Sequence, residues 1–264
     1  MNRSGTLGMA LHQFLSFAPP MTALSRREAV FWPGCALMGL DPAILLKTAE
    51  VLRREEPELG LSACCCGQPS RYLLEKSFPA RRDRLAALLE RRGVRCVYAA
   101  CPNCARELEG LVEVRPIWSV LARCIRREDI SGSAAAVTIH DPCPLRNQPE
   151  ELAAARVLLE LAGAAVTEPA HSGQKTVCCG NIQMLRTRDP EKSRALRIAR
   201  IGEFPQGQPV TSCCEGCLDA FRGEGLDTVH LLEVLFGRSK TRGWGNRLAF
   251  TRLAQKTQKE AGYD

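Results

Sequence analysis

Aromatic residues and long apolar segments are both scarce in this sequence. Phe, Tyr and Trp make up only 5% of its 264 residues, so a core would depend on Leu, Val, Ile and Ala. An apolar run from Leu7 to Phe17 is interrupted by His12 and Gln13. It is shorter than the roughly 20 residues that cross a bilayer. A signal peptide is a weak alternative, because no small-residue cleavage site follows the run cleanly. A globular protein of one large or two smaller domains is therefore expected.

Several cofactor and nucleic-acid motifs are also missing. The chain has no flavin or nicotinamide fingerprint and no ferredoxin run of the form C-x₂-C-x₂-C-x₃-C-P. It has no helix-turn-helix signature, zinc-finger spacing or interleaved aromatic and basic residues, so nucleic acid is not an expected partner. If the protein carries out redox chemistry, its electrons must be exchanged with a partner protein, such as a ferredoxin-like protein or a flavoprotein.

Most of the excess positive charge lies at one end of the chain. The formal net charge is +7, and residues 238–264 hold seven basic residues against Glu260 and Asp264. This segment is expected to be a solvated, partly disordered basic tail. Contact with an anionic membrane surface or an acidic subunit is the alternative, and the tail is the only segment through which membrane contact is expected.

Cysteine is the one residue type in clear excess. The chain has 14 cysteines, many of them adjacent or three positions apart. Neighbouring cysteines suit structural disulfides poorly but gather thiolates well at a metal centre. The chain is also long for a disulfide scaffold and lacks a convincing secretion signal. A reducing compartment is expected, namely the cytoplasm, with a peripheral position at the inner membrane face as a variant of that location.

The cysteines form an internal repeat. A shift of 113 residues superimposes Cys65, Cys66, Gly67, Cys101 and Cys104 on Cys178, Cys179, Gly180, Cys214 and Cys217. One further cysteine precedes each set, Cys35 in the first half and Cys143 in the second. The repeat predicts two similar domains. The predicted boundaries are an N-terminal extension at 1–28, a first domain at 29–133, a second at 134–237 and the tail at 238–264.

Strand and helix signals alternate in both halves. Short apolar strands at 29–32, 94–99, 136–139 and 209–212 run into cysteines, and helices are expected at 41–54, 81–92, 149–161 and 189–201. Terminal helices are expected near Ile117 and Val229. The alternation predicts an α/β fold with a small parallel sheet in each half. Parallel sheets place their sites at the carboxyl ends of the strands, where these cysteines fall.

Each half offers five thiols, more than a tetrahedral zinc ion uses. Most iron–sulfur clusters need about four thiolates, so the pattern favours one such cluster in each half. A zinc site and a disulfide or redox-sensor site are alternatives that fit less well. No histidine lies at a ligand spacing from the cysteines, which also counts against zinc.

Five short motifs carry a resemblance to a known family. They are Phe31-Trp32-Pro33-Gly34-Cys35, Cys65-Cys66-Gly67, His140-Asp141-Pro142-Cys143, Cys178-Cys179-Gly180 and Cys214-x-x-Cys217. Over roughly residues 29 to 237 they resemble the CCG (cysteine-rich) domain family. That family includes the cysteine-rich subunit of heterodisulfide reductase and the iron–sulfur subunits of glycolate and lactate oxidation systems.

The resemblance implies two CCG domains related by a pseudo-twofold axis. In the cysteine-rich subunit of heterodisulfide reductase, each motif holds a non-cubane [4Fe-4S] cluster through five cysteines, and the clusters together cleave a disulfide substrate. Carried over by motif, the expected ligands of the first cluster are Cys35, Cys65, Cys66, Cys101 and Cys104. Those of the second are Cys143, Cys178, Cys179, Cys214 and Cys217.

Five other residues are ambiguous. Cys64 makes a triple cysteine, so the ligand pair could be Cys64-Cys65, although the repeat and Gly67 favour Cys65-Cys66. Cys64 and Cys213 flank expected ligands, whereas Cys96 and Cys124 are expected to be small buried hydrophobes. His140 is the one candidate catalytic residue. It either packs at a strand end, beside a helix-capping Asp141, or donates a proton to substrate or a hydrogen bond to the cluster.

The leading functional expectation is an oxidoreductase subunit that reduces a disulfide-type substrate with electrons from a partner protein. The alternative is an electron-transfer subunit of a glycolate- or lactate-type dehydrogenase complex, with no small-molecule substrate of its own.

Overall fold

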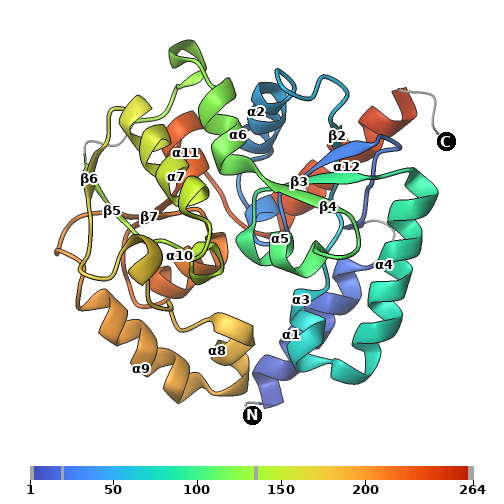
Figure 1. The fold of residues 1–264 in the computed structure, drawn as a ribbon. Helices are drawn as coiled ribbons and strands as arrows, with labels where there is room; N and C mark the ends of the chain where they lie inside the picture. Colours follow the sequence, from blue (N-terminus) through green and yellow to red (C-terminus); the bar gives the residue numbers. More distant parts are fainter. Residues whose placement is uncertain (1–2, 19–20, 134–135, 261–264) are drawn as a thin grey trace. The chain divides into compact units, whose positions relative to one another are not determined.

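Two four-stranded β-sheets, one in each half of the chain, form the framework of the protein (Figure 1). The computed structural model describes residues 3–18, 21–133 and 136–260. Contacts within the chain divide these residues into two compact units: 3–117 with 240–260, and 118–239. Among the described residues, the terminal segments 3–18 and 240–260 therefore group with the first unit.

The first unit is built on a parallel sheet with strand order β2-β1-β3-β4. Its strands are β1 (Ala29–Trp32), β2 (Gly60–Leu61), β3 (Cys96–Ala99) and β4 (Glu113–Pro116). Its helices are α1 (Arg3–Ser16), α2 (Pro42–Leu52), α3 (Gln68–Leu73), α4 (Phe78–Arg92), α5 (Pro102–Leu108) and α12 (Trp244–Glu260), with short 3₁₀ turns η2 (Leu37–Gly39) and η3 (Glu75–Ser77). The central strand β1 is apolar and buried along its whole length, as is typical of a strand covered on both faces.

The second unit repeats this plan with strand order β6-β5-β7-β8, again all parallel. Its strands are β5 (Ala136–Ile139), β6 (Ala165–Thr167), β7 (Val210–Ser212) and β8 (Thr228–His230). Its helices are α7 (Pro149–Leu161), α8 (Leu185–Arg188), α9 (Pro190–Ile201), α10 (Glu215–Arg222) and α11 (Leu231–Phe236), with α6 (Ile117–Cys124) beginning at the boundary between the units. The 3₁₀ turns are η4 (Arg127–Asp129), η5 (Cys143–Leu145), η6 (Gly173–Lys175) and η7 (Ile182–Met184). The predicted α/β fold with one parallel sheet in each half is confirmed.

Local capping explains where the predicted helices begin and end. The side chain of Asp41 accepts a hydrogen bond from the amide of Ala43 at 3.0 Å, and the side chain of Asp189 accepts one from the amide of Lys192 at 3.0 Å. Gly93 ends α4 in the left-handed conformation, at φ +70°. Helix α4 begins at Phe78, three residues before the predicted start, because Pro79 sits in its first turn.

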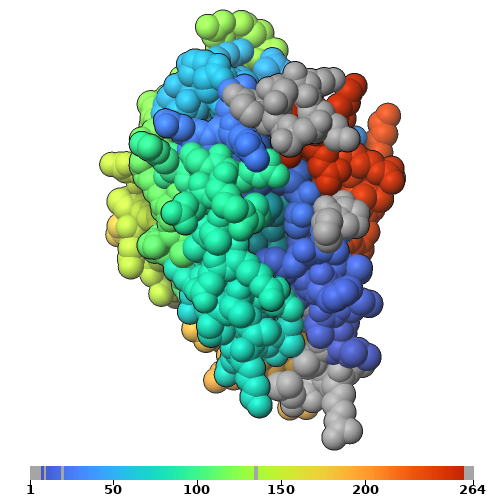
Figure 2. All heavy atoms as spheres, turned by 90° about the vertical axis from the view of Figure 1, so that its right-hand side faces the viewer, coloured from blue at the N-terminus to red at the C-terminus, as the bar shows by residue number. Residues whose placement is uncertain are grey.

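The basic C-terminal segment differs from the expectation of a solvated, partly disordered tail. It forms the 17-residue helix α12, which packs against α2 and η2 of the first unit. Phe250, Thr251 and Ala254 are completely buried on its inner face. Figure 2 shows this helix (red) on the same face of the molecule as the N-terminal segment (blue). The basic side chains Arg252 and Lys256 remain exposed.

Helix α1 buries polar side chains and exposes apolar ones, which is the reverse of the usual amphipathic arrangement. Leu7 and Phe14 are exposed, whereas Gln13 and Ser16 are completely buried. Helix α1 contacts α3, and the guanidinium of Arg247 on α12 donates a hydrogen bond to the Ser16 hydroxyl at 3.0 Å. The polar face of α1 is therefore its inner face. No helix among the residues that the structure describes is long and apolar enough to span a membrane.

Candidate metal centres

The first cysteine set gathers at one edge of the first sheet. Cys35 follows β1, Cys65 and Cys66 follow β2, and Cys101 and Cys104 follow β3. These three strands are neighbours in the sheet and run parallel, so their carboxyl ends meet at the same edge. Cys101 is the residue before the first turn of α5, and Cys104 lies within that turn. The sheet topology therefore brings together segments that are up to about 70 residues apart in the sequence.

The five thiols of this set form one unbroken series of side-chain contacts. Hydrogen bonds join the thiols in the order Cys35, Cys65, Cys66, Cys104 and Cys101. The sulfur atoms of Cys66 and Cys104 are 3.3 Å apart. Hydrogen bonds from the Cys35 and Cys66 thiols hold the pKa of Cys65 well below its usual range. The amide of Gly67 also donates to the sulfur of Cys65 at 3.4 Å.

The second cysteine set repeats this geometry. Cys143 opens η5 after β5, Cys178 and Cys179 lie on the long connection after β6, and Cys214 and Cys217 lie at the start of α10 after β7. The thiols are joined in the order Cys143, Cys178, Cys179, Cys217 and Cys214. The sulfur atoms of Cys179 and Cys217 are 3.1 Å apart. Hydrogen bonds from the thiols of Cys143 and Cys179 lower the pKa of Cys178 to about 2.

The four remaining cysteines lie outside both series. The Cys64 thiol donates to the carbonyl of Ala23 at 3.3 Å, and burial raises its pKa to about 12. Burial also raises the pKa of Cys213 well above its usual value. Cys96 is buried on β3, as expected, whereas Cys124 on α6 is only partly buried. In the triple cysteine, the pair that joins the series is therefore Cys65-Cys66.

Gly34 makes the close approach of Cys35 to the other thiols possible. Its φ is +87°, and a Cβ atom there would lie 2.8 Å from Cys101 Cβ and 3.0 Å from Cys104 Sγ. We expect Gly34→Ala to displace Cys101 and Cys104 and to lower metal incorporation in the first half. The matched control is Gly110→Ala, which carries a similar conformational cost of about 1–2 kcal/mol but meets no atom within 4 Å. Metal content per chain after anaerobic purification checks this, and equal metal in both variants would contradict it.

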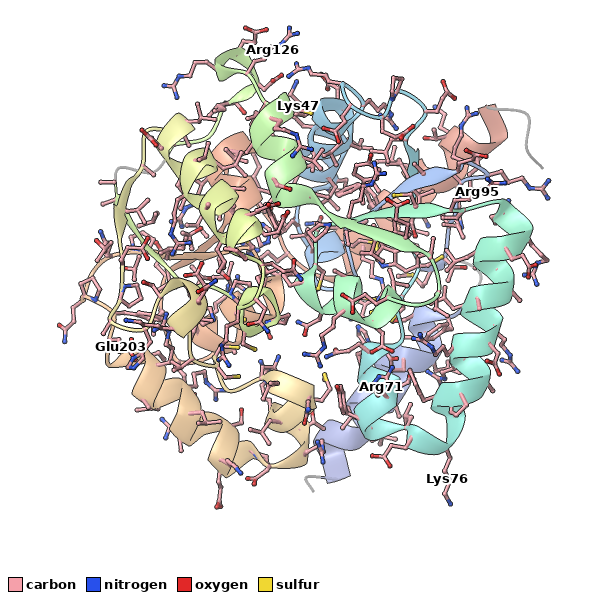
Figure 3. All side chains as sticks on the ribbon, in the orientation of Figure 1. Lys47, Arg71, Lys76, Arg95, Arg126 and Glu203 are labelled. Atoms are coloured by element: carbon pink, nitrogen blue, oxygen red, sulfur yellow. The ribbon has the colours of Figure 1, made fainter. Side chains whose placement is uncertain are left out.

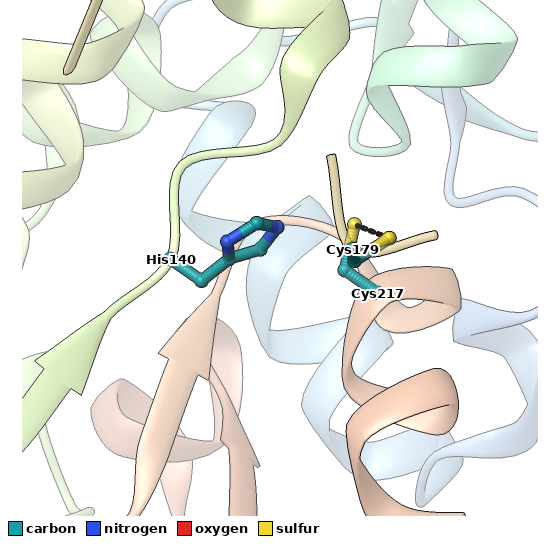
Figure 4. Close-up of side chains that lie close together, drawn as sticks. All are labelled: His140, Cys179 and Cys217. Carbon is teal, nitrogen blue, oxygen red and sulfur yellow. Dashed lines mark hydrogen bonds between the residues drawn. The ribbon is translucent and has the colours of Figure 1, made fainter. Parts of the chain in front are cut away.

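His140 joins the second set in space. One of its ring nitrogens and the sulfur atoms of Cys179 and Cys217 all lie within 4.8 Å of one another (Figure 4). The Nδ1 atom accepts a hydrogen bond from Arg200 Nε at 3.2 Å, and Phe221 packs edge-on to the ring at 4.9 Å. Burial, followed by the charge of Arg200, lowers the pKa of His140 to about 3, so the ring is neutral. No histidine lies at a zinc-ligand spacing in the sequence, yet the fold brings His140 close to Cys179 and Cys217.

Hydrogen bonds to Asp141 hold the loop that leads to Cys178 in place. Its carboxylate accepts two hydrogen bonds from Arg156 at 2.8 Å and one from the amide of Gly173 at 2.6 Å. Its carbonyl accepts a hydrogen bond from the Thr176 hydroxyl at 2.6 Å. The expectation that Asp141 caps a helix is wrong, because its partners hold the connection after β6 in place.

Sequence reasoning missed two residues of the terminal helices that lie near the first set. The Gln13 side-chain amide points to the sulfur of Cys65 at 3.8 Å and is held by the Ser70 hydroxyl at 2.6 Å. Arg247 is only 3% exposed, and its charge acts on the Cys35 thiol. Neither residue belongs to a recognisable motif, and the segments that carry them are remote in sequence from the cysteines.

Buried donors without partners accompany both thiol sets. In the described part of the chain, Trp32 Nε1, Arg247 Nε and Nη2, His140 Nε2 and Arg200 Nη2 have no hydrogen-bond partner. Buried donors are rarely left unpaired in native proteins. An anionic group held by the thiolates would supply acceptors. Five thiols in each set and these donors therefore fit an iron–sulfur cluster in each unit.

Two parallel-sheet α/β units, each with a thiol set at the carboxyl edge of its strands, define a duplicated cysteine-rich metal-site protein. The profile of the Cysteine-rich domain family, CCG, matches residues 29–109 and 137–222. The chain belongs to this family. The match supports iron–sulfur binding and an electron-transfer role.

The other comparisons add little. No curated protein matches the chain. Among solved structures, the chain is similar to an aspartate racemase homologue from Pyrococcus horikoshii OT3 at 14% identity, over 87% of this chain and 99% of that one. The TM-score of that comparison is 0.27.

Proposed function

We propose that this protein is an iron–sulfur oxidoreductase subunit similar to the cysteine-rich subunit of heterodisulfide reductase. It would hold one [4Fe-4S] cluster in each unit and reduce a disulfide-type substrate with electrons from a partner protein. The observation that carries the proposal is the completeness of both thiol sets. Each contains all five cysteines of the family motif, joined in the same order.

The number of thiols supports a non-cubane type of cluster. A cubane [4Fe-4S] cluster takes four thiolates, so the fifth thiol of each set would have no role in a cubane site. The first set would use Cys35, Cys65, Cys66, Cys101 and Cys104. The second would use Cys143, Cys178, Cys179, Cys214 and Cys217.

Reduction of a disulfide needs two electrons and two protons and yields two thiols. When bound, the clusters would transfer these electrons one at a time. The chain's own residues would hold the clusters, exclude water from the buried thiolates and balance negative charge. Arg247 in the first unit and Arg200 in the second would balance negative charge, and the neutral side chains of Gln13 and His140 would offer hydrogen bonds.

The electron source must be another protein, because the chain carries no nucleotide-cofactor or ferredoxin motif. A ferredoxin-like protein or a flavoprotein would serve. Protein purified anaerobically with its clusters is expected to reduce at least one disulfide in a panel when a reduced viologen dye supplies electrons. Cys178→Ser is expected to lose this activity, and Cys213→Ser, a buried cysteine outside the series, is expected to retain it.

Three results would contradict the proposal in different ways. If no disulfide is reduced while electrons still pass to a partner protein, the chain is an electron-transfer subunit of a glycolate- or lactate-type complex. If zinc is found without iron or acid-labile sulfide, the sites are zinc sites. If both sites hold iron and sulfide but the spectra show cubanes, only the cluster type is wrong.

A further inference from the structure

Trp32 and His140 occupy the same place in the two units. Each lies three residues before the first cysteine of its set, Cys35 or Cys143. Trp32 is the last residue of β1, and His140 directly follows the last residue of β5, the strand at the same position in the order of the second sheet. Both side chains are buried, with exposed fractions of 0% and 1%. The two positions are therefore structural equivalents occupied by different aromatic rings.

Both rings carry a buried nitrogen without a partner. Trp32 Nε1 and His140 Nε2 have no hydrogen-bond partner among the residues that the structure describes. An indole nitrogen is always a donor, so Trp32 presents an N–H group. Leaving a buried donor unpaired is costly, and native folds generally provide an acceptor.

The two rings also lie in the parts of the two cores that hold equivalent cysteines. Trp32 packs in the core cluster that contains Cys66 and Cys104. His140 lies beside Cys179 and Cys217, and Figure 4 shows its ring directed toward their sulfur atoms. Cys66 and Cys104 are the counterparts of Cys179 and Cys217 in the repeat. An acceptor bound by these cysteines would offer a partner to the unpaired nitrogen of each unit.

Arg200 determines which nitrogen of His140 carries the proton. Its Nε donates to His140 Nδ1 at 3.2 Å. A guanidinium group only donates hydrogen bonds, so Nδ1 must present its lone pair and the ring proton must be on Nε2. Arg200 is completely buried and is anchored by Glu203, labelled in Figure 3, whose carboxylate accepts from its Nη1 at 2.7 Å. The N–H group of His140 is thus fixed on the side of the cysteines.

We infer that Trp32 Nε1 and His140 Nε2 are equivalent hydrogen-bond donors to the sulfur atoms of the two clusters, and that Arg200 is the residue that positions His140. This inference rests on the proposed clusters. Hydrogen bonds to cluster sulfur favour the reduced, more negative state and so raise its reduction potential. His140 then acts as a fixed donor, so the protons that complete thiol formation come from another source.

Potentiometric titration followed by EPR tests the inference. Trp32→Phe removes the indole N–H and keeps an aromatic ring, and His140→Phe does the same for the imidazole. Each variant is expected to lower the reduced-to-oxidised ratio of one cluster about tenfold at a fixed potential, a shift of about −59 mV for a one-electron couple, and to leave the other cluster unchanged. Arg200→Met is expected to shift the same cluster as His140→Phe.

Two control variants separate the effect of the hydrogen bond on the reduction potential from the effect of altered core packing. His140→Gln restores a donor and is expected to recover part of the shift, whereas Trp118→Phe removes a buried indole elsewhere and is expected to leave both potentials unchanged. In the wild-type protein, electron–nuclear double resonance with ¹⁵N-tryptophan or ¹⁵N-histidine is expected to detect coupling to the reduced clusters, without any substitution. Normal cluster content with unchanged potentials and no ¹⁵N coupling would overturn the inference. Absence of iron and sulfide from the wild-type protein would instead overturn the proposed function.

Discussion

Replacement of Cys65 or Cys178 by serine is expected to remove about half of the protein-bound iron and to abolish disulfide reduction. Each of these residues contacts two other thiols of its set, so its loss interrupts the series. The double variant is expected to retain almost no iron. Iron and acid-labile sulfide per chain, measured together with EPR of the reduced protein, check this result.

The matched controls come from the cysteines outside the two series. Cys213→Ser changes a buried thiol next to Cys214, and Cys64→Ser changes one next to Cys65. Both variants are expected to retain their iron, because the Cys64 thiol is engaged with the Ala23 carbonyl and Cys213 lies outside the second series. If Cys64→Ser loses as much iron as Cys66→Ser, the ligand pair in the first half is Cys64-Cys65. That result would contradict the contact order in the structure.

The repeat and the strands that enter the cysteines could be predicted from the sequence. The apolar residues of β1, the proline that opens α7 and the capping aspartate of α9 are local signals, and the structure confirms these elements. The edge strands were missed because they carry no such signal. β2 has only two residues, and β4, with the sequence EVRP, is partly exposed and ends in proline. Such strands are defined by pairing with a neighbour, which no local pattern reports.

The surroundings of the thiol sets could not be predicted, because they come from remote segments that break the usual burial rules. Gln13 is buried while the apolar side chains Leu7 and Phe14 of the same helix are exposed. Arg200 and Arg247 are buried cations on helices that otherwise look solvated. A buried charge is rare unless something compensates for it. The burial of these polar and charged side chains can be explained only once the fold shows that the cysteines lie near them.

A large loss of stability is expected from a substitution in α12, the helix that the charge pattern alone predicts to be solvated. Phe250 is completely buried in the first unit, on the same helix as the buried Arg247. Phe250→Ala is expected to lower the free energy of unfolding of the first unit by about 3–5 kcal/mol, because the substitution leaves a cavity in a packed core. Release of Arg247 and Ser16 from their contact would also uncover the first thiol set. Faster loss of iron from one of the two sites is therefore expected.

Denaturant unfolding of the anaerobically purified full chain, with cluster release followed in parallel, measures both consequences. Leu253→Ala is the matched control, because Leu253 lies on the same helix but is 38% exposed, and its truncation is expected to cost less than about 1 kcal/mol. If Phe250→Ala behaves like Leu253→Ala, α12 does not pack on the first unit in solution. If it lowers stability but leaves the rates of iron loss equal at both sites, the helix supports the fold without shielding the thiols. Preferential loss from one site would instead make the basic C-terminal segment part of the first metal centre, through Arg247.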